Sequence, residues 1–348
     1  MGGASGLAHS LLANGVMNGA HARRIGSARS SHYGAAQSGG FHMRIAAMAA
    51  GAVGAYFGGR LAAAGHDVFF IARRANLEAM RKNGLKLESV HGDLHLPKVN
   101  ATDDPKEVGV VDVVLFAVKL WDTETAAELT KPMVGPNTRV ITLQNGVDSY
   151  ERVSKILGKE QTVPGTAYIA AVLGGPGVMK HTSKFATIRC GRMEGTPDPK
   201  LEAFVEAAKA ANIDIQPQDD MNRERWQKFI FLSSMAGANC MTREPIGKIL
   251  ADPDTRALYR KLMEESLAVG QKAGAKVPSS WVEDRMSFSD NAPAGMKASM
   301  LHDLEAGNRL ELDWLTGKVV SLGRELGVPT PVSESVYAAV KLHRMGKQ

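Results

Sequence analysis

MRIAAMAAGAVGAYFGGRLAAAGHDVFFIARR, residues 43–74, contains two short apolar runs separated by a glycine-containing turn and a segment of small residues. The apolar runs at 44–48 and 67–72 are typical of buried strands, and segment 51–64 reads as a helix that ends at Gly65. A strand, a helix and a second strand in this order predict a βαβ unit with parallel strands. We therefore expect the fold to begin near Met43.

The same alternation continues along the first two thirds of the chain. A helix is expected at 76–83, buried strands at 110–118 and 139–143 with a helix at 122–131 between them, sheet or hairpin at 163–192, and a helix at 199–211. From about residue 219 onward only helical periodicity remains. The sequence therefore predicts an α/β fold: a dinucleotide-binding domain at 43–218, with its ligand at the carboxyl ends of the strands, and an all-helical domain at 219–348.

The composition is that of an ordinary globular protein, since 348 residues with 44% hydrophobic content can bury a substantial core. Three of the six net positive charges come from Arg23, Arg24 and Arg29, and no basic block follows, so we expect no nucleic-acid partner. No run of 18 apolar residues predicts a membrane span. Cys190 and Cys240 have no metal-ligand spacing, which favours buried core thiols, no metal site and a reducing, cytoplasmic location. A homodimer is compatible with the sequence.

Residues 1–42 differ from the rest, because they are rich in Gly, Ala and Ser and contain no Asp or Glu. We expect a disordered, dispensable extension. A transit peptide is an alternative, and so is a start codon placed too early, since Met43 directly begins a strand.

The turn after the first strand is the predicted cofactor loop: Ala49, Ala50, Gly51, Ala52, Val53 and Gly54. Gly51 would let the backbone approach a pyrophosphate at the helix N-terminus, and Gly54 would let helix and strand pack closely. The usual first glycine is replaced by Ala49, which would cost roughly 1–2 kcal/mol if the turn needs a positive φ. A tight βα turn without a nucleotide is the alternative.

The second strand ends in Arg73 and Arg74, at the position where an NAD enzyme usually carries an acidic residue for the ribose. Two arginines there suit a 2′-phosphate, so NADPH is the expected cofactor.

Lys228 is the last charged residue before fourteen uncharged ones, FIFLSSMAGANCMT at 229–242. Burial in so apolar a stretch lowers the pKa of a lysine and makes it a better proton donor near neutral pH. A lysine that extends its ammonium into water at a helix end is the alternative. Together with the cofactor loop, Lys228 predicts a nicotinamide-linked reductase.

Six segments resemble the ketopantoate reductase (2-dehydropantoate 2-reductase) family in the expected order over residues 43–345: residues 43–74, FAVKLWDT, LQNGV, RWQKF, SMLHDLEAGNRLELD and GVPTP. The resemblance implies a Rossmann-like domain followed by an all-helical domain like that of 6-phosphogluconate dehydrogenase. It also implies reduction of a 2-keto acid with NADPH.

The resemblance implies a role for each matching site residue. Lys228 would donate the proton to the ketone oxygen, Glu311 would hold the substrate hydroxyl, and Ser299 would hold its carboxylate. Asn145 would lie at the nicotinamide and the substrate, Lys119 would reach the cofactor or substrate, and Arg73 would bind the 2′-phosphate. Simpler readings stay open: a helix-start serine for Ser299, a plain turn at Asn145, and a solvated lysine for Lys119.

Glu311 also stands out by its spacing. Leu301, Leu304, Asn308, Glu311 and Leu315 follow a helical 3-4-3-4 pattern, so Glu311 occupies a place where an apolar stripe expects leucine. A buried carboxylate is costly unless it is paired or functional. The alternative places Glu311 at the edge of the stripe with its carboxylate in water.

Some positions depart from the family pattern. Leu232 and Ala236 stand four and eight residues after Lys228, where the family carries asparagines, and Ser333 replaces another asparagine. Asn239 lies near the same helical face as Lys228 and would compensate in part by binding substrate. The keto acid is therefore expected to be bulkier or less polar than ketopantoate if it differs from it.

The sequence as a whole predicts NADPH-dependent reduction of 2-dehydropantoate to pantoate in pantothenate biosynthesis. The alternatives are a reductase of another branched 2-keto acid and a non-catalytic, dinucleotide-binding regulatory protein.

Overall fold

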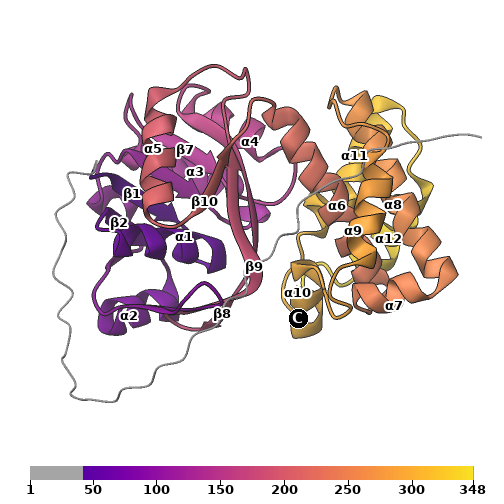
Figure 1. Cartoon of the computed structure of the whole chain (residues 1–348), viewed down its shortest axis with the longest axis horizontal. Coiled ribbons are helices and arrows are strands. Elements are labelled where there is room, and N and C mark those ends of the chain that lie inside the picture. The colour runs from indigo at the N-terminus through magenta and orange to yellow at the C-terminus, as the bar shows by residue number, and fades with distance from the viewer. Residues whose placement is uncertain (1–41, 348) are drawn as a thin grey trace, which may run out of the picture. The chain divides into compact units, whose positions relative to one another are not determined.

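The computed structural model describes residues 42–347, which belong to one compact unit. The extension expected at 1–42 lies outside the described residues, apart from His42. Figure 1 shows the strands in the part of the chain coloured indigo to red, whereas the orange and yellow part consists of helices.

Among residues 42–347, six parallel strands form the first part of the sheet. Hydrogen bonds link them in the order β5, β2, β1, β6, β7 and β8. Their bounds are Arg44–Met48 (β1), Asp67–Ile71 (β2), Asn100–Thr102 (β5), Val113–Phe116 (β6), Arg139–Thr142 (β7) and Thr162–Gly175 (β8). Because β1 lies between β2 and β6, the strand order reverses at its carboxyl end, which is where ligands bind in such sheets.

The sheet continues beyond β8. The strand β9 (Val178–Cys190) pairs antiparallel with β8 and confirms the hairpin expected at 163–192. Two further strands pair parallel with β9: β3 (Leu85–Ser89) and β10 (Asp214–Pro217). The strand β4 (Leu94–Leu96) pairs antiparallel with β3. The sequence patterns predict none of β3, β4, β5 and β10. These strands are short, and their partners are set by long-range pairing, as where Lys86 lies beside Val178.

Both faces of the parallel sheet are buried, as is usual for parallel sheets. Ile45 and Ala47 of β1 point into a core shared with α1, α2 and α5, whereas Ala46 and Met48 point into a second core shared with α3 and α4. The helices are α1 (Ala52–Ala63), α2 (Arg74–Asn83), α3 (Thr123–Thr130), α4 (Ser149–Leu157) and α5 (Pro199–Ala210), with short 3-10 helices η1 (Pro105–Glu107), η2 (Leu120–Asp122) and η3 (Lys131–Met133).

The chain from residue 221 to residue 347 contains helices and no strand, as predicted. The boundary expected near Gln218 falls in the short link between β10 and α6. These helices surround a third apolar core. They are α6 (Met221–Thr242), α7 (Ile246–Ala251), α8 (Pro253–Lys272), α9 (Trp281–Asp290), α10 (Ser299–Ala306), η4 (Leu312–Trp314), α11 (Thr316–Leu326) and α12 (Pro331–Lys341). The structure therefore confirms a Rossmann-like part followed by a helical part.

The apolar spacing over residues 301–315 suggests one continuous helix, and this is wrong. The helix α10 ends at Ala306, and Gly307 adopts a left-handed conformation with φ of 72° that turns the chain away. Glu311 consequently lies on an irregular segment between two helices rather than in an apolar stripe.

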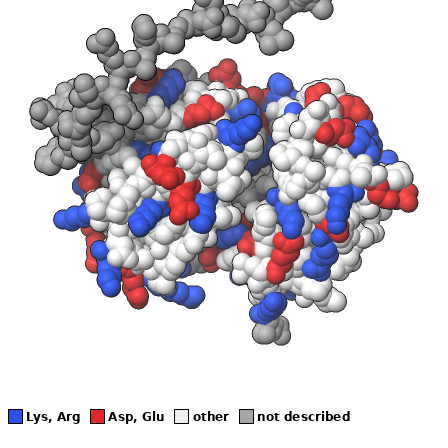
Figure 2. Space-filling model, turned by 60° about the horizontal axis from the view of Figure 1, so that its bottom comes forward, with Lys and Arg blue, Asp and Glu red and all other residues white. Residues whose placement is uncertain are grey.

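The surface carries charges of both signs. On the face in Figure 2, blue and red side chains are interspersed, which gives no continuous basic surface there. None of the helices within residues 42–347 is long and apolar enough to cross a bilayer.

Candidate active site

The predicted cofactor loop connects β1 to α1. Ala49 has a φ of 65°, so the turn does require the left-handed conformation that glycine adopts without strain. A Cβ atom on Gly54 would lie 2.5 Å from the Ala49 carbonyl oxygen, which explains why this position is glycine. Gly51 is the N-cap residue of α1; it offers no side-chain cap and has open space beside it, so the first amides of the helix remain available for an anion.

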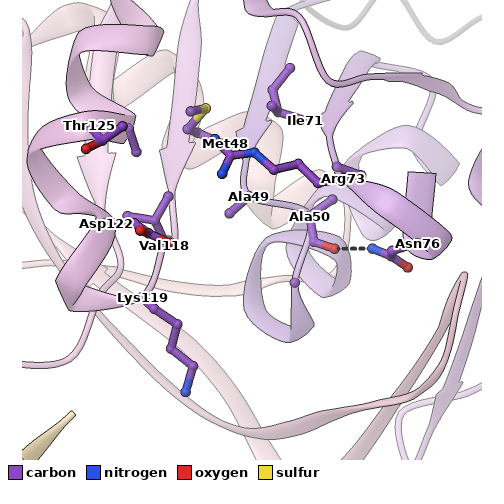
Figure 3. A pocket seen from close by; sticks show the side chains of 13 residues that line it. Met48, Ala49, Ala50, Ile71, Arg73, Asn76, Val118, Lys119, Asp122 and Thr125 are labelled. Carbon is purple, nitrogen blue, oxygen red and sulfur yellow. Dashed lines mark hydrogen bonds between the residues drawn. The ribbon is translucent and has the colours of Figure 1, made fainter. Parts of the chain in front are cut away.

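A pocket opens at the carboxyl ends of β1, β2 and β6, where Figure 3 shows Arg73 extending toward Met48. Its lining includes Ala49, Ala50, Gly51, Arg73 and Lys119 from the predicted cofactor residues. Arg74, by contrast, does not line it, and neither do Ala52, Val53, Gly54 and Asn145. The loop, the uncapped N-terminus of α1 and the two cationic side chains fit a dinucleotide.

Asn76 lines the same pocket and is a residue that sequence reasoning misses. Its Nδ2 donates to the Ala50 carbonyl over 2.9 Å, as drawn in Figure 3, and its Oδ1 accepts from the Gly177 amide over 2.8 Å. The side chain thus ties the cofactor loop to the turn between β8 and β9. No signal in the sequence marks it, because an asparagine in the first turn of a helix is common.

Lys228 lies in the second turn of α6, and its ammonium is held by two acceptors. The Nζ atom donates to Asn145 Oδ1 over 3.1 Å and to the Ala167 carbonyl over 2.7 Å. Burial lowers the pKa of Lys228 from 10.5 to about 8, and attraction to Glu224 and Glu311 offsets only part of this effect. The alternative of an ammonium extended into water is therefore wrong.

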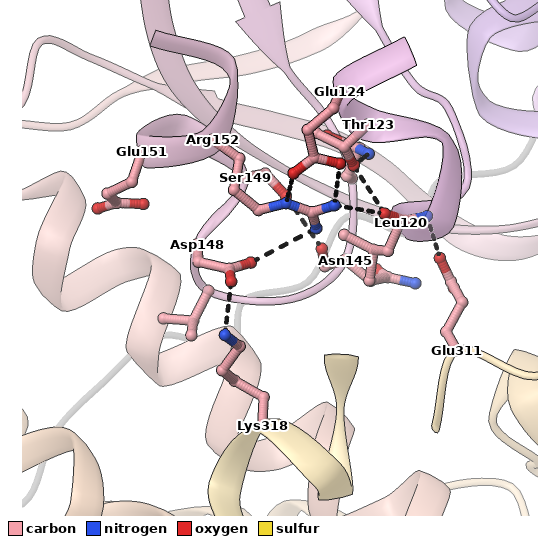
Figure 4. Close-up of polar contacts among 12 residues, drawn as sticks. Leu120, Thr123, Glu124, Asn145, Asp148, Ser149, Glu151, Arg152, Glu311 and Lys318 are labelled. Atoms are coloured by element: carbon pink, nitrogen blue, oxygen red, sulfur yellow. Dashed lines mark hydrogen bonds and ion pairs between the residues drawn. The ribbon is translucent and has the colours of Figure 1, made fainter. Parts of the chain in front are cut away.

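Glu311 is buried, with 6% of its surface exposed, and its carboxylate has defined partners. The amide of Leu120 donates to Glu311 Oε1 over 3.0 Å, and Figure 4 shows this bond close to Asn145. Lys119 Nζ lies 3.9 Å from Glu311 Oε2 and donates to Asp303 Oδ2 over 2.9 Å. The alternative of a solvated carboxylate is thus wrong.

Lys119 is a half-exposed cation between two acids. Burial lowers the pKa of Lys119, but attraction to Glu311 and Asp303 outweighs burial, so the pKa lies above its ordinary value. The structure therefore keeps Lys119 charged near neutral pH while it makes Lys228 a readier proton donor.

Ser299 is the first residue of α10 and is exposed. It stands four residues before Asp303, the partner of Lys119, so both lie on one face of the helix. This placement puts Ser299 on the side of α10 that faces Lys119.

Asn239 does not have the free side chain that a substrate ligand needs. It is fully buried; its Nδ2 donates to the Glu244 carbonyl over 2.8 Å and its Oδ1 accepts from the Ala298 amide over 2.9 Å. The prediction for Asn239 is therefore corrected: the amide fastens the end of α6 to the start of α10.

The departures from the family pattern have structural explanations in part. Ala236 is fully buried within the helical core, and Leu232 is partly buried against it, one turn beyond Lys228. Ser333 is also buried, and its amide and hydroxyl both donate to Glu265 of α8. Position 236 is thus a packing position here, whereas Leu232 is the departure that lies close to Lys228 along the helix.

A model of the family described as "Ketopantoate reductase PanE/ApbA" matches residues 45–195, and one described as "Ketopantoate reductase PanE/ApbA C terminal" matches residues 220–344. The chain belongs to the ketopantoate reductase family. The resemblance inferred from six sequence segments is therefore confirmed, and the protein is an oxidoreductase.

Two relatives match nearly all of their own length. A 2-dehydropantoate 2-reductase of Mesorhizobium japonicum is 30% identical over 86% of this chain and 97% of the relative. An uncharacterized oxidoreductase, YkpB, of Bacillus subtilis is 29% identical over 88% of this chain and 100% of the relative. The first of these relatives supports reduction of a keto acid, and both support an oxidoreductase.

Solved structures agree with the fold. A PanE/ApbA family ketopantoate reductase from Ralstonia eutropha superposes with a TM-score of 0.80 at 32% identity, covering 87% of this chain and 98% of that one. A D-mandelate dehydrogenase with bound NADH has a TM-score of 0.79 at 17% identity, over 87% of this chain and 98% of that one, which is a likeness of fold alone.

Within residues 42–347, no group of three His, Cys, Asp or Glu side chains could hold a metal ion. Cys190 and Cys240 are free and buried, and burial raises the pKa of each thiol to about 12. Both cysteines are therefore inert thiols at neutral pH.

Proposed function

We propose that this family member reduces 2-dehydropantoate to pantoate with NADPH, a reaction of pantothenate biosynthesis. One observation carries the proposal: the desolvated ammonium of Lys228 is held by Asn145 and Ala167, in electrostatic reach of Glu311. A proton donor with a pKa near 8, in a chain that also carries a pocket for a dinucleotide, is what reduction of a ketone requires.

A bound nicotinamide would supply the hydride for the carbonyl carbon. Lys228 would donate the proton to the carbonyl oxygen, and Asn145 would hold the ammonium in place as it does in the free protein. Glu311 would bind the substrate hydroxyl, while Ser299 would donate to the substrate carboxylate. Lys119, which remains charged, would attract the anionic substrate or cofactor.

The preference for NADPH rests on Arg73. This side chain lines the pocket at the end of β2, where a charge-assisted hydrogen bond to the 2′-phosphate is available. Arg74 does not line the pocket, so we assign the preference to Arg73 and no longer to both arginines.

A different branched 2-keto acid is the second candidate for the substrate. Leu232 supports it, because an apolar residue one turn after Lys228 replaces the hydrogen-bonding group that the family pattern places there. A non-catalytic regulatory protein is disfavoured, since the contacts of Lys228 and Glu311 are those expected of working groups. We also propose a cytoplasmic location, which two free buried thiols favour, and leave a homodimer open.

The decisive experiment is NADPH oxidation measured with a panel of 2-keto acids that includes ketopantoate. We expect turnover, and Lys228→Ala should lower kcat by roughly 10²–10⁴-fold, the usual contribution of general acid catalysis. Binding of NADPH should stay nearly unchanged, because Lys228 does not line the pocket at the cofactor loop. Near-full turnover by Lys228→Ala, or no turnover with any keto acid, would refute the proposal.

A further inference from the structure

A buried carboxylate that the proposed mechanism does not use lies one turn before Lys228 on α6. Glu224 has 4% of its surface exposed and stands four residues before Lys228, so the two side chains share one helix face. An ionised carboxylate in such a position must be compensated by donors or by cations.

Three side chains from the β8–β9 hairpin donate to this carboxylate. Tyr168 Oη donates to Glu224 Oε1 over 2.7 Å, and Thr166 Oγ1 donates to the same oxygen over 3.3 Å. Arg189 Nη1 lies 3.2 and 3.1 Å from the two carboxylate oxygens. The hairpin thus fixes the position of the Glu224 carboxylate.

The same hairpin also holds Lys228. Ala167, between Thr166 and Tyr168 on β8, accepts from the ammonium, and the ammonium lies 5.6 Å from the centre of the Tyr168 ring. Arg189 lies over that ring as well, at 4.9 Å. One segment of β8 therefore contacts both Lys228 and the carboxylate one turn away from it.

We propose that Glu224, held by Tyr168 and Arg189, is a positioning residue that keeps the Lys228 ammonium charged and in place for proton transfer. This inference rests on the proposed function in so far as Lys228 is the proton donor. It adds a group that acts on Lys228 and does not touch the substrate.

The charges around Lys228 explain why a second carboxylate is needed. Burial lowers the pKa of Lys228, and two acids oppose burial: Glu224 on α6 and Glu311 before η4. Glu311 is shared with Lys119, and Glu224 with Arg189, while Tyr168 is neutral because burial and Glu224 raise its pKa. Without Glu224, only Glu311, which is shared with Lys119, would oppose the effect of burial on the pKa of Lys228.

The test is an NMR titration of the full-length protein labelled with ¹³C-lysine, without substrate or cofactor. Loss of one signal in Lys228→Ala identifies Lys228. We expect Glu224→Gln to lower the titration midpoint of Lys228 by about one pH unit or more, the usual effect of a nearby charge. Arg189→Gln should raise the midpoint, because it leaves Glu224 uncompensated.

Glu265→Gln is the matched control. Glu265 also accepts bonds in the helical part, from the backbone and hydroxyl of Ser333, but it is not among the charges that act on Lys228. This change should leave the midpoint where it is. An unchanged midpoint in Glu224→Gln would overturn the inference; should that variant fail to fold, a midpoint that does not rise in Arg189→Gln would overturn it.

Kinetics separate this inference from the proposed function. With an active keto acid, Glu224→Gln should move the alkaline limb of the kcat–pH profile to lower pH by as much as the NMR midpoint moves. Above both midpoints, kcat should then fall about tenfold for each pH unit by which the midpoint is lowered. Below both midpoints kcat should return toward that of the unmodified protein, whereas a merely structural role would lower kcat at every pH. A lowered NMR midpoint without turnover on any keto acid would refute the function and keep the inference.

Discussion

Replacing Lys228 by methionine should change how the stability of the protein depends on pH. The pKa of Lys228 is about 8 in the folded protein and near 10.5 in the unfolded chain. Between these values the unfolded chain binds more protons, so stability rises with pH by up to 1.4 kcal/mol per pH unit. At pH 7 the charge on Lys228 therefore lowers the free energy of unfolding by at most about 3 kcal/mol, compared with a neutral lysine at this position. This destabilisation disappears as pH rises toward 10.5.

The assay is urea unfolding of both proteins at several pH values from 7 to 10. Methionine has a similar length and no charge, so the variant loses this pH dependence, while all other titrating groups cancel in the difference. From pH 7 to pH 10, we expect the free energy of unfolding of the unmodified protein to rise by about 2 to 3 kcal/mol relative to that of the variant. The bonds lost to Asn145 and Ala167 change the difference by a constant only.

Lys119→Met is the matched control, because the pKa of Lys119 is raised rather than lowered. The charged form of Lys119 therefore adds to the free energy of unfolding at every pH below the pKa that Lys119 has in the unfolded chain. This contribution is lost only as pH rises through the higher pKa of the folded protein. The difference in unfolding free energy between the unmodified protein and Lys119→Met should thus stay constant between pH 7 and 9. A flat difference for Lys228→Met as well would refute the conclusion that the Lys228 ammonium is desolvated.

Further changes test the loop, the pocket and the corrected residue. Ala49→Gly relieves a positive φ, so thermal unfolding should show unchanged or slightly higher stability, and NADPH should bind modestly more tightly by fluorescence titration; clearly weaker binding would contradict this. Arg73→Gln should remove most of the preference for NADPH over NADH, with Arg74→Gln as the nearly silent control; equal affinity for both cofactors in the unmodified protein would refute the assignment. Asn76→Ala should weaken dinucleotide binding several-fold through the loosened loop without changing the pH dependence of kcat. Asn239→Ala should lower the free energy of unfolding by about 1–3 kcal/mol through two lost buried hydrogen bonds, and a raised KM without lost stability would restore the substrate role.

Local patterns were sufficient for the main elements of the fold. The runs at 44–48 and 67–72 are apolar at every position that the sheet buries, and helix 199–211 ends within one residue of α5. Strands such as β3 and β10 escaped prediction because their stability comes from pairing with β9, about 90 residues away from β3 and 25 residues away from β10.

The left-handed turn at Gly307 shows a second limit of patterns. The 3-4-3-4 spacing through residues 301–315 continues across this glycine, but the helix does not, so the spacing predicted the burial of Glu311 for a reason that the structure does not support. What holds the buried Glu311 carboxylate is the amide of Leu120, 191 residues away.

By itself, the sequence determined the apolar run that follows Lys228, because fourteen successive uncharged residues are a local property that no tertiary arrangement can change. It also determined that alanine stands where the cofactor loop usually carries glycine, whereas the structure decided that Ala49 adopts a positive φ. Tertiary structure alone decided which acceptors hold the Lys228 ammonium and that Tyr168 and Arg189 hold the carboxylate of Glu224. The physical reason is that a buried polar group is satisfied by whichever partner the strand register and helix packing bring within hydrogen-bonding distance, and such partners leave no periodic trace in the chain.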